Sequence, residues 1–225
     1  MKTGVYYVSY ALISNLAIGL CFVPFLFLGW KKMRQVGAYR AIAVYWLVTG
    51  LINLFNLDLF GQFRSTSLQE KLTFFYNLAD TPLVLLIFAY AACGKSRNRL
   101  LWIVFGFIVL EAGLIFRIGY NFNSSTMIIG AGLILVWIYS ITGLVQYMKQ
   151  MEHTAFENSM VFVYAALLFA YSSFLIIYIF IHIHDSGINS GRDSFLLYYI
   201  GLLLSATLTS LGLWGYGLRR RHAMA

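Results

Sequence analysis

The chain has 225 residues, of which 60% are apolar, 18% are aromatic and only 11% are charged. A soluble domain carries roughly 25% charged residues to cover its surface, so this composition excludes an ordinary soluble domain and indicates a chain solvated by a lipid bilayer. The 16 basic residues outnumber the 8 acidic residues and give a net charge of +8, which in a membrane protein is typical of basic cytoplasmic loops and not of nucleic-acid binding.

Apolar runs long enough to cross a bilayer recur along the whole chain. A membrane-spanning helix needs about 20 mostly apolar residues. The sequence predicts seven such helices, at residues 5–30, 41–60, 72–93, 100–120, 126–147, 159–182 and 194–218. Strands of a β-barrel would alternate in polarity over about ten residues, and no such alternation occurs. We therefore expect an all-α fold, a single seven-helix transmembrane domain over residues 1–225.

The first and third predicted helices each contain a proline. The first run is longer than the roughly 7–15 apolar residues of a secretory signal, so we expect it to be retained. Pro24 and Pro82 should kink their helices, and each should release a backbone carbonyl about one turn earlier. In the seventh predicted helix, Gly201, Ser205 and Thr209 recur at four-residue intervals, which favours close packing against another helix.

Basic residues are unevenly divided between the two sides of the membrane. Eleven of the 16 lie in the loops after the first, third and fifth predicted helices or in the tail: Lys31, Lys32, Arg34, Arg40, Lys95, Arg97, Arg99, Lys149, Arg219, Arg220 and Arg221. Because positive loops resist translocation, we expect this side to be cytoplasmic, the N-terminus to lie outside and the C-terminus inside. We expect a bacterial inner membrane protein whose basic inner face can meet a cytoplasmic or membrane protein partner.

Ionisable residues inside the predicted helices are the most informative, because desolvating a charge costs at least about 2.5–3.5 kcal/mol. At 1.5 Å per residue, Asp80 in the third helix and Glu111 in the fourth both lie about 12–13 Å below the outer boundary. Of the other polar residues, Asn53 lies near this level, Ser172 lies slightly deeper, and Asn77 and Arg117 lie above it. The inner halves are almost purely apolar, so the sequence predicts a polar pocket that faces outward.

Two interpretations of the two acids stay open. Either they are neutral or hydrogen-bonded and fasten helices together, or they bind a ligand or accept a proton. At the outer mouth, His182, His184 and Asp185 form a weaker candidate metal site. Residues two apart point in different directions on a helix, so these histidines could share an ion only where the helix has ended. We therefore expect no metal and no cofactor.

The segment Asp80-Thr81-Pro82-Leu83 resembles the Asp and Thr-Pro-Leu elements in the third helix of microbial rhodopsins, which share the seven helices and the outside N-terminus. Retinal requires a lysine in the seventh helix, and residues 194–218 contain none. This resemblance therefore implies architecture and not a retinal chromophore. The chain is also similar to small seven-helix bacterial membrane proteins without assigned activity, in its short basic inner loops, its Asp80 and its aromatic, serine-bearing segment from Phe162 to Phe174.

These observations favour a protein that is not an enzyme. We expect it to bind a small or lipophilic ligand in the outward-facing pocket, as a receptor-like sensor or an accessory subunit. A proton-coupled transporter of a small solute or lipid, with one of the acids as the proton carrier, is the alternative. A third alternative is a membrane-embedded metal hydrolase, but hydrolases of that kind need several intramembrane histidines and this chain has none in the middle of a predicted helix.

Overall fold

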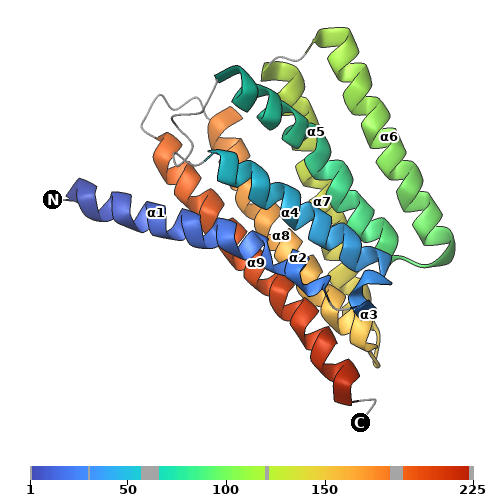
Figure 1. Cartoon of the computed structure of the whole chain (residues 1–225). Helices are drawn as coiled ribbons and strands as arrows, with labels where there is room; N and C mark the ends of the chain where they lie inside the picture. Colours follow the sequence, from blue (N-terminus) through green and yellow to red (C-terminus); the bar gives the residue numbers. More distant parts are fainter. Residues whose placement is uncertain (1, 30, 57–65, 120–121, 183–189, 223–225) are drawn as a thin grey trace. The chain divides into compact units, whose positions relative to one another are not determined.

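The computed structural model is helical and has no strand in the part of the chain that it describes (Figure 1), which comprises residues 2–29, 31–56, 66–119, 122–182 and 190–222. The helices in these ranges are α1 (Lys2–Cys21), α2 (Val23–Phe27), α3 (Lys31–Arg34), α4 (Gly37–Asn56), α5 (Thr66–Ala91), α6 (Gly94–Ile118), α7 (Phe122–Lys149), α8 (Ala155–His182) and α9 (Ser190–His222). The prediction of an all-α chain is confirmed.

Seven helical segments are long and apolar enough to cross a membrane. They are Ser9–Phe27, Gly37–Phe55, Lys71–Ala91, Gly94–Ile118, Ser124–Lys149, Ala155–Ile179 and Leu196–Gly217. Each overlaps one of the seven predicted helices, so the number of long apolar helices and their order along the chain were predicted correctly.

The helices begin three to six residues earlier than the starts predicted from their apolar runs, so the predicted starts were wrong; α5, for example, begins at Thr66 instead of 72. α4 begins at Gly37 instead of 41, α6 at Gly94 instead of 100, and α8 at Ala155 instead of 159. The added turns of α4 and α6 carry basic residues such as Arg40 and Arg97, both of which are exposed. A basic side chain can lay its stem along apolar surface while its charge stays in water, so a helix continues past the end of an apolar run.

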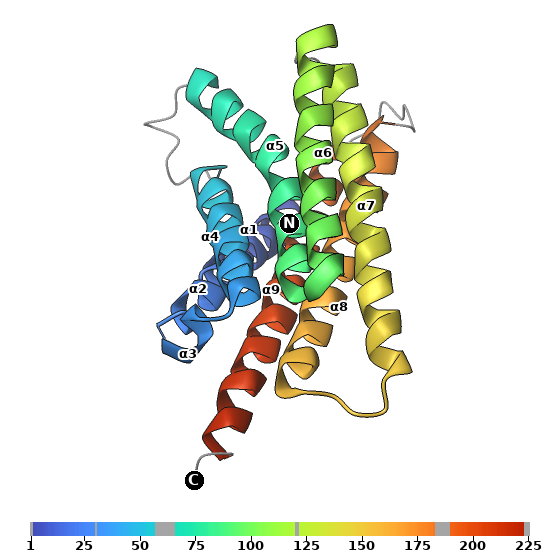
Figure 2. The ribbon, with the colours of Figure 1, turned by 90° about the vertical axis from the view of Figure 1, so that its right-hand side faces the viewer.

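The first predicted helix is interrupted, whereas the third is continuous. α1 ends at Cys21 and α2 begins at Val23, which places Pro24 in the first turn of α2, where its missing N–H needs no helical partner. Pro82 lies inside α5. Figure 2 shows α5 changing direction along its length, as expected of a helix with an internal proline.

The chain groups into two compact units, and α7 contributes to both. The first unit comprises residues 1–27 and 135–225, and the second comprises residues 28–134. In the first unit, α8, α1 and α2 all pack against α9. In the second unit, α5 packs against both α4 and α6, and α3 packs against α4. The expectation of a single domain over residues 1–225 stays a prediction.

Glycines bring α8 and α9 close together in the first unit. A Cβ atom on Gly201 would lie 3.0 Å from the side chain of Ser173, and one on Gly212 would lie 2.8 Å from the carbonyl oxygen of Ser159. Ser205 and Thr209 are fully buried on the same helix. The small residues of α9 therefore lie where the sequence places a close helix contact.

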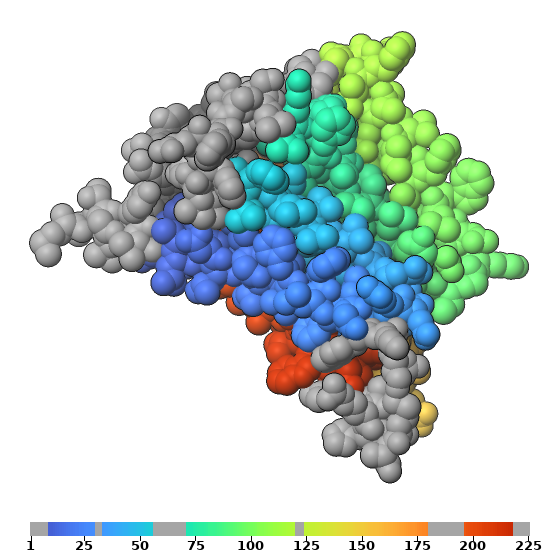
Figure 3. Space-filling model, in the orientation of Figure 1, coloured from blue at the N-terminus to red at the C-terminus, as the bar shows by residue number. Residues whose placement is uncertain are grey.

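The second unit is organised around α5. Val84, Leu85 and Ile87 of this helix are fully buried, as is Trp46 of α4. At the end of α5, the ring of Tyr90 lies against Gly37 at the start of α4. The other side of α5 faces α6, whose side chains lie largely at the surface (Figure 3).

Candidate functional site

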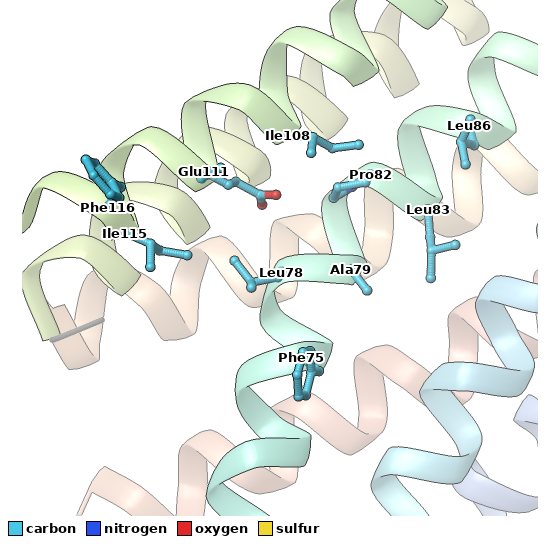
Figure 4. Close-up of a pocket in the computed structure, with 11 residues that line it drawn as sticks. Phe75, Leu78, Ala79, Pro82, Leu83, Leu86, Ile108, Glu111, Ile115 and Phe116 are labelled. Carbon is cyan, nitrogen blue, oxygen red and sulfur yellow. The ribbon is translucent and has the colours of Figure 1, made fainter. Parts of the chain in front are cut away.

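The α5–α6 hairpin encloses a groove in the second unit (Figure 4). The two helices are joined by Ala92 and Cys93, and Gly94 at the start of α6 has a φ of 57°, a conformation that glycine adopts without steric cost. A cavity of about 660 Å³ lies between them. α5 lines it with Phe75, Leu78, Ala79, Pro82, Leu83 and Leu86, and α6 lines it with Ile108, Glu111, Ala112, Ile115 and Phe116.

The spacing of these residues explains why they share one groove. On each helix they recur at intervals of three and four residues, so they occupy one face. Ala79 on α5 and Ala112 on α6 are small and leave space between the two backbones. The volume falls within the roughly 300–1,000 Å³ of small-molecule sites. Because Phe75 is 64% exposed and Phe116 is 94% exposed, the groove opens onto the surface of the helices.

Glu111 is the one ionisable residue in this lining. Its side chain is only 4% exposed, and its Oε1 atom is buried without a hydrogen-bond partner among the described residues. Figure 4 shows its carboxyl group directed from α6 toward α5, on the side where Pro82 lies. A buried polar group without a hydrogen bond costs free energy, and a donor on a bound molecule would remove that cost.

Pro82 interrupts the backbone hydrogen bonds of α5. In a regular helix the carbonyl of Leu78 would accept a hydrogen bond from the N–H of residue 82, but proline has no N–H to donate. Leu78 and Pro82 both line the groove. The carbonyl of Leu78 therefore lacks its usual helical donor, on the helix that forms one wall of the groove.

Asp80 lies close to Glu111, although it does not line the groove. The two carboxyl groups interact electrostatically across α5 and α6, so they would repel each other when both are ionised. Asp80 is half-buried. Asp80 and Glu111 are two of the six candidate ligand-binding residues, and their role in binding stays a prediction.

The other four candidates lie outside the groove lining. Asn53 is buried on α4 and donates a hydrogen bond from Nδ2 to the carbonyl of Thr49 at 2.9 Å. The hydroxyl of Tyr76 on α5 lies 3.5 Å from Oγ1 of Thr49, so this polar cluster links α4 to α5. Asn77 is half-buried on α5, and Arg117 is exposed in the last turn of α6.

Ser172 lies in the first unit, on α8. Its Oγ atom accepts a hydrogen bond from Nε1 of Trp137 on α7 at 3.2 Å. This contact joins two helices and gives Ser172 a packing role in that unit. A contribution of Ser172 to ligand binding stays a prediction.

The candidate metal ligands at the outer mouth fall mostly outside the described part of the chain. His182 is the last residue of α8 and its side chain is not described, and His184 and Asp185 both lie outside the described residues. Within the described ranges, no group of three or more His, Cys, Asp or Glu side chains is arranged to hold a metal ion.

The sequence does not distinguish the apolar walls of the groove from ordinary lipid-facing residues. Leu83, Leu86 and Ile108 have the same side-chain chemistry as residues that face acyl chains. Four residues of the lining could have indicated the groove from the sequence. Glu111 is an acid inside an apolar helix, Pro82 distorts the helix opposite, and Ala79 and Ala112 are small enough to leave space beside the acid. The lining is thus far more apolar than the polar pocket expected from the sequence.

Comparison of the chain with models of protein families, with curated proteins and with solved structures finds no match.

Proposed function

We propose that the chain is a multi-pass membrane protein that binds a lipophilic ligand in the α5–α6 groove. Glu111 carries the proposal, because it is a buried acid whose Oε1 atom has no hydrogen-bond partner in the described part of the chain and lies in a cavity large enough for a small molecule. The seven long apolar helices support the membrane assignment. The excess of basic residues in one set of loops supports an outside N-terminus and a cytoplasmic C-terminus.

The apolar walls favour a ligand that reaches the groove from within the bilayer. Apart from Glu111, all the lining residues are hydrocarbon or aromatic, so a water-soluble polar solute would find few partners there. The exposed rings of Phe75 and Phe116 border the opening, which in a membrane would face acyl chains. A lipophilic molecule dissolved in the bilayer could enter sideways without crossing water.

A photoreactive alkyl probe tests this proposal. In full-length protein reconstituted in lipid nanodiscs, we expect the probe to label groove residues on α5 and α6 more strongly than other lipid-facing segments, as mapped by mass spectrometry. Ala112→Phe places a large ring inside the groove and should reduce this labelling several-fold.

Gly113→Phe is the matched control. It adds a side chain of the same final size at the next position on α6, which does not line the groove and has open space around it. Labelling should stay unchanged in this variant. Labelling that is spread evenly over all lipid-facing helices and is insensitive to Ala112→Phe would mean that the groove holds only bulk lipid.

A further inference from the structure

We propose that the groove selects lipophilic molecules with a primary ammonium head group, which donates hydrogen bonds to Glu111. This inference rests on the proposed function and narrows it to one class of ligand, single-chain lipophilic amines. Three properties of the groove favour such a ligand: its hydrogen-bond acceptors, the negative charge near Glu111 and the apolar walls on either side of it.

The carboxyl group of Glu111 offers acceptors that need a donor. Its Oε1 atom is buried and accepts no hydrogen bond from a described residue, and Glu111 lies in the lining of the groove. A primary ammonium group carries three N–H donors, so it can donate to both oxygens of the carboxylate, whereas an alcohol can donate only one hydrogen bond.

The charge around Glu111 also favours a cation. Asp80 lies within electrostatic range of it, and repulsion between like charges is strong in a medium of low dielectric constant. Arg117, which lies on the same helix, is exposed in the last turn of α6 and more than one turn away from Glu111. An ammonium group bound at Glu111 would supply positive charge beside both acids, whereas a carboxylate head group would add a third negative charge.

The groove has apolar walls on both sides of Glu111, against which the alkyl chain of a lipophilic amine can pack. Along α6, Glu111 lies between Ile108 and Ile115, and the walls on either side of it are apolar. Because α5 and α6 are antiparallel neighbours, Leu86 and Ile108 lie toward one end of the groove and Phe75 and Phe116 toward the other. A chain attached to the ammonium group can therefore lie along hydrocarbon while the nitrogen meets the carboxyl group.

A set of photoreactive probes with identical chains and different head groups tests the inference. The heads are a primary amine, an alcohol, a carboxylic acid and a quaternary trimethylammonium, each presented to the full-length protein in neutral phosphatidylcholine nanodiscs. After normalisation to the amount of probe in the bilayer, we expect groove labelling by the amine to exceed labelling by the acid at least about tenfold. The alcohol and the quaternary ammonium should fall between them, because one lacks the charge and the other lacks a donor.

Glu111→Gln should abolish the preference for the amine over the alcohol, because the amide side chain carries no charge. Glu152→Gln is the control for net charge, because Glu152 is an exposed acid in the connection before α8, and it should leave the ranking unchanged. The ranking in the natural protein needs no variant, so it decides the inference even if Glu111→Gln fails to fold.

Each contrary result has a distinct meaning. Equal labelling by all four heads, or labelling by the amine that equals labelling by the alcohol, would overturn the ammonium assignment and leave the lipophilic groove standing. An amine preference that survives in folded Glu111→Gln would also overturn it. Failure of every head group to label α5 and α6 above background would overturn the proposed function as well.

Discussion

Gly212 on α9 occupies a position where a side chain would meet the backbone of α8. A Cβ atom at this position would lie 2.8 Å from the carbonyl oxygen of Ser159 and 2.8 Å from Cβ of Phe162. Neither neighbour is the end of a flexible side chain, so the helices would have to move apart. We expect Gly212→Ala to lower the free energy of unfolding by about 1–3 kcal/mol, the usual cost of overpacking, as measured by thermal unfolding of the purified protein.

Gly215, less than one turn further along α9, provides the control. A Cβ atom at this position would meet nothing within 4 Å. Gly215→Ala should therefore be neutral, or stabilising by up to about 1 kcal/mol, because alanine favours the helical backbone. Equal destabilisation by the two substitutions would show that the close contact with α8 is not what position 212 requires.

At the scale of a single element, the start of α8 is fixed by a reciprocal cap. The hydroxyl and backbone N–H of Thr154 both donate to Oε2 of Glu157, at 2.9 and 2.8 Å, and the N–H of Glu157 donates back to Oγ1 of Thr154 at 3.2 Å. This is a capping box, which satisfies N–H groups that the first turn of a helix leaves without partners. We expect Thr154→Ala to destabilise the protein by about 1 kcal/mol in chemical unfolding experiments.

Thr142→Ala gives the comparison for this cap. The hydroxyl of Thr142 donates to the carbonyl of Ile138 within α7 and is exposed, so its loss should change stability by less than about 0.5 kcal/mol. If the two alanine variants unfold alike, the capping box contributes no measurable stability.

The helices illustrate what a sequence can and cannot predict in a chain of this kind. Their number and order follow from length and apolarity, because the thickness of a bilayer fixes how long an apolar run must be. The start of α6 at Gly94 was missed, since Lys95, Arg97 and Arg99 interrupt the apolar pattern but not the helix. The cap at Thr154 depends on side-chain geometry in a short connection and is visible in the sequence only as a Thr and a Glu three residues apart.

The groove, too, could be predicted from the sequence only in part. Asp80 and Glu111 were expected near one depth because the rise per residue of a helix is constant, and in the structure their carboxyl groups lie within electrostatic range of each other. The lining itself depends on which faces of α5 and α6 meet. That rotation is set by packing over many residues, so the roles of Ala79 and Ala112 and the position of Asn53 outside the lining could not be read from spacing.

At the scale of the whole molecule, the two cysteines of the chain offer a test of its orientation. Cys93 is exposed in the connection between α5 and α6, and Cys21 is buried. If the basic loops are cytoplasmic, a membrane-impermeant maleimide should leave intact cells unlabelled and should modify one cysteine per chain after permeabilisation. Cys93→Ser should remove that label, because Cys21 is 0% exposed and stays unreactive until the protein unfolds.

A cysteine introduced at Ser65, in the predicted outer loop of a cysteine-free variant, should show the opposite pattern and react in intact cells. Labelling of Cys93 in intact cells would instead show that the connection between α5 and α6 lies outside.

The position of Cys93 also fixes the depth of Glu111 in the bilayer. Glu111 lies 18 residues beyond Cys93, or about 27 Å along α6 at 1.5 Å per residue, and so lies far from the membrane surface at which Cys93 reacts. A cytoplasmic Cys93 therefore places Glu111 in the outer half of the bilayer, where an ammonium head group would approach it from the outer leaflet.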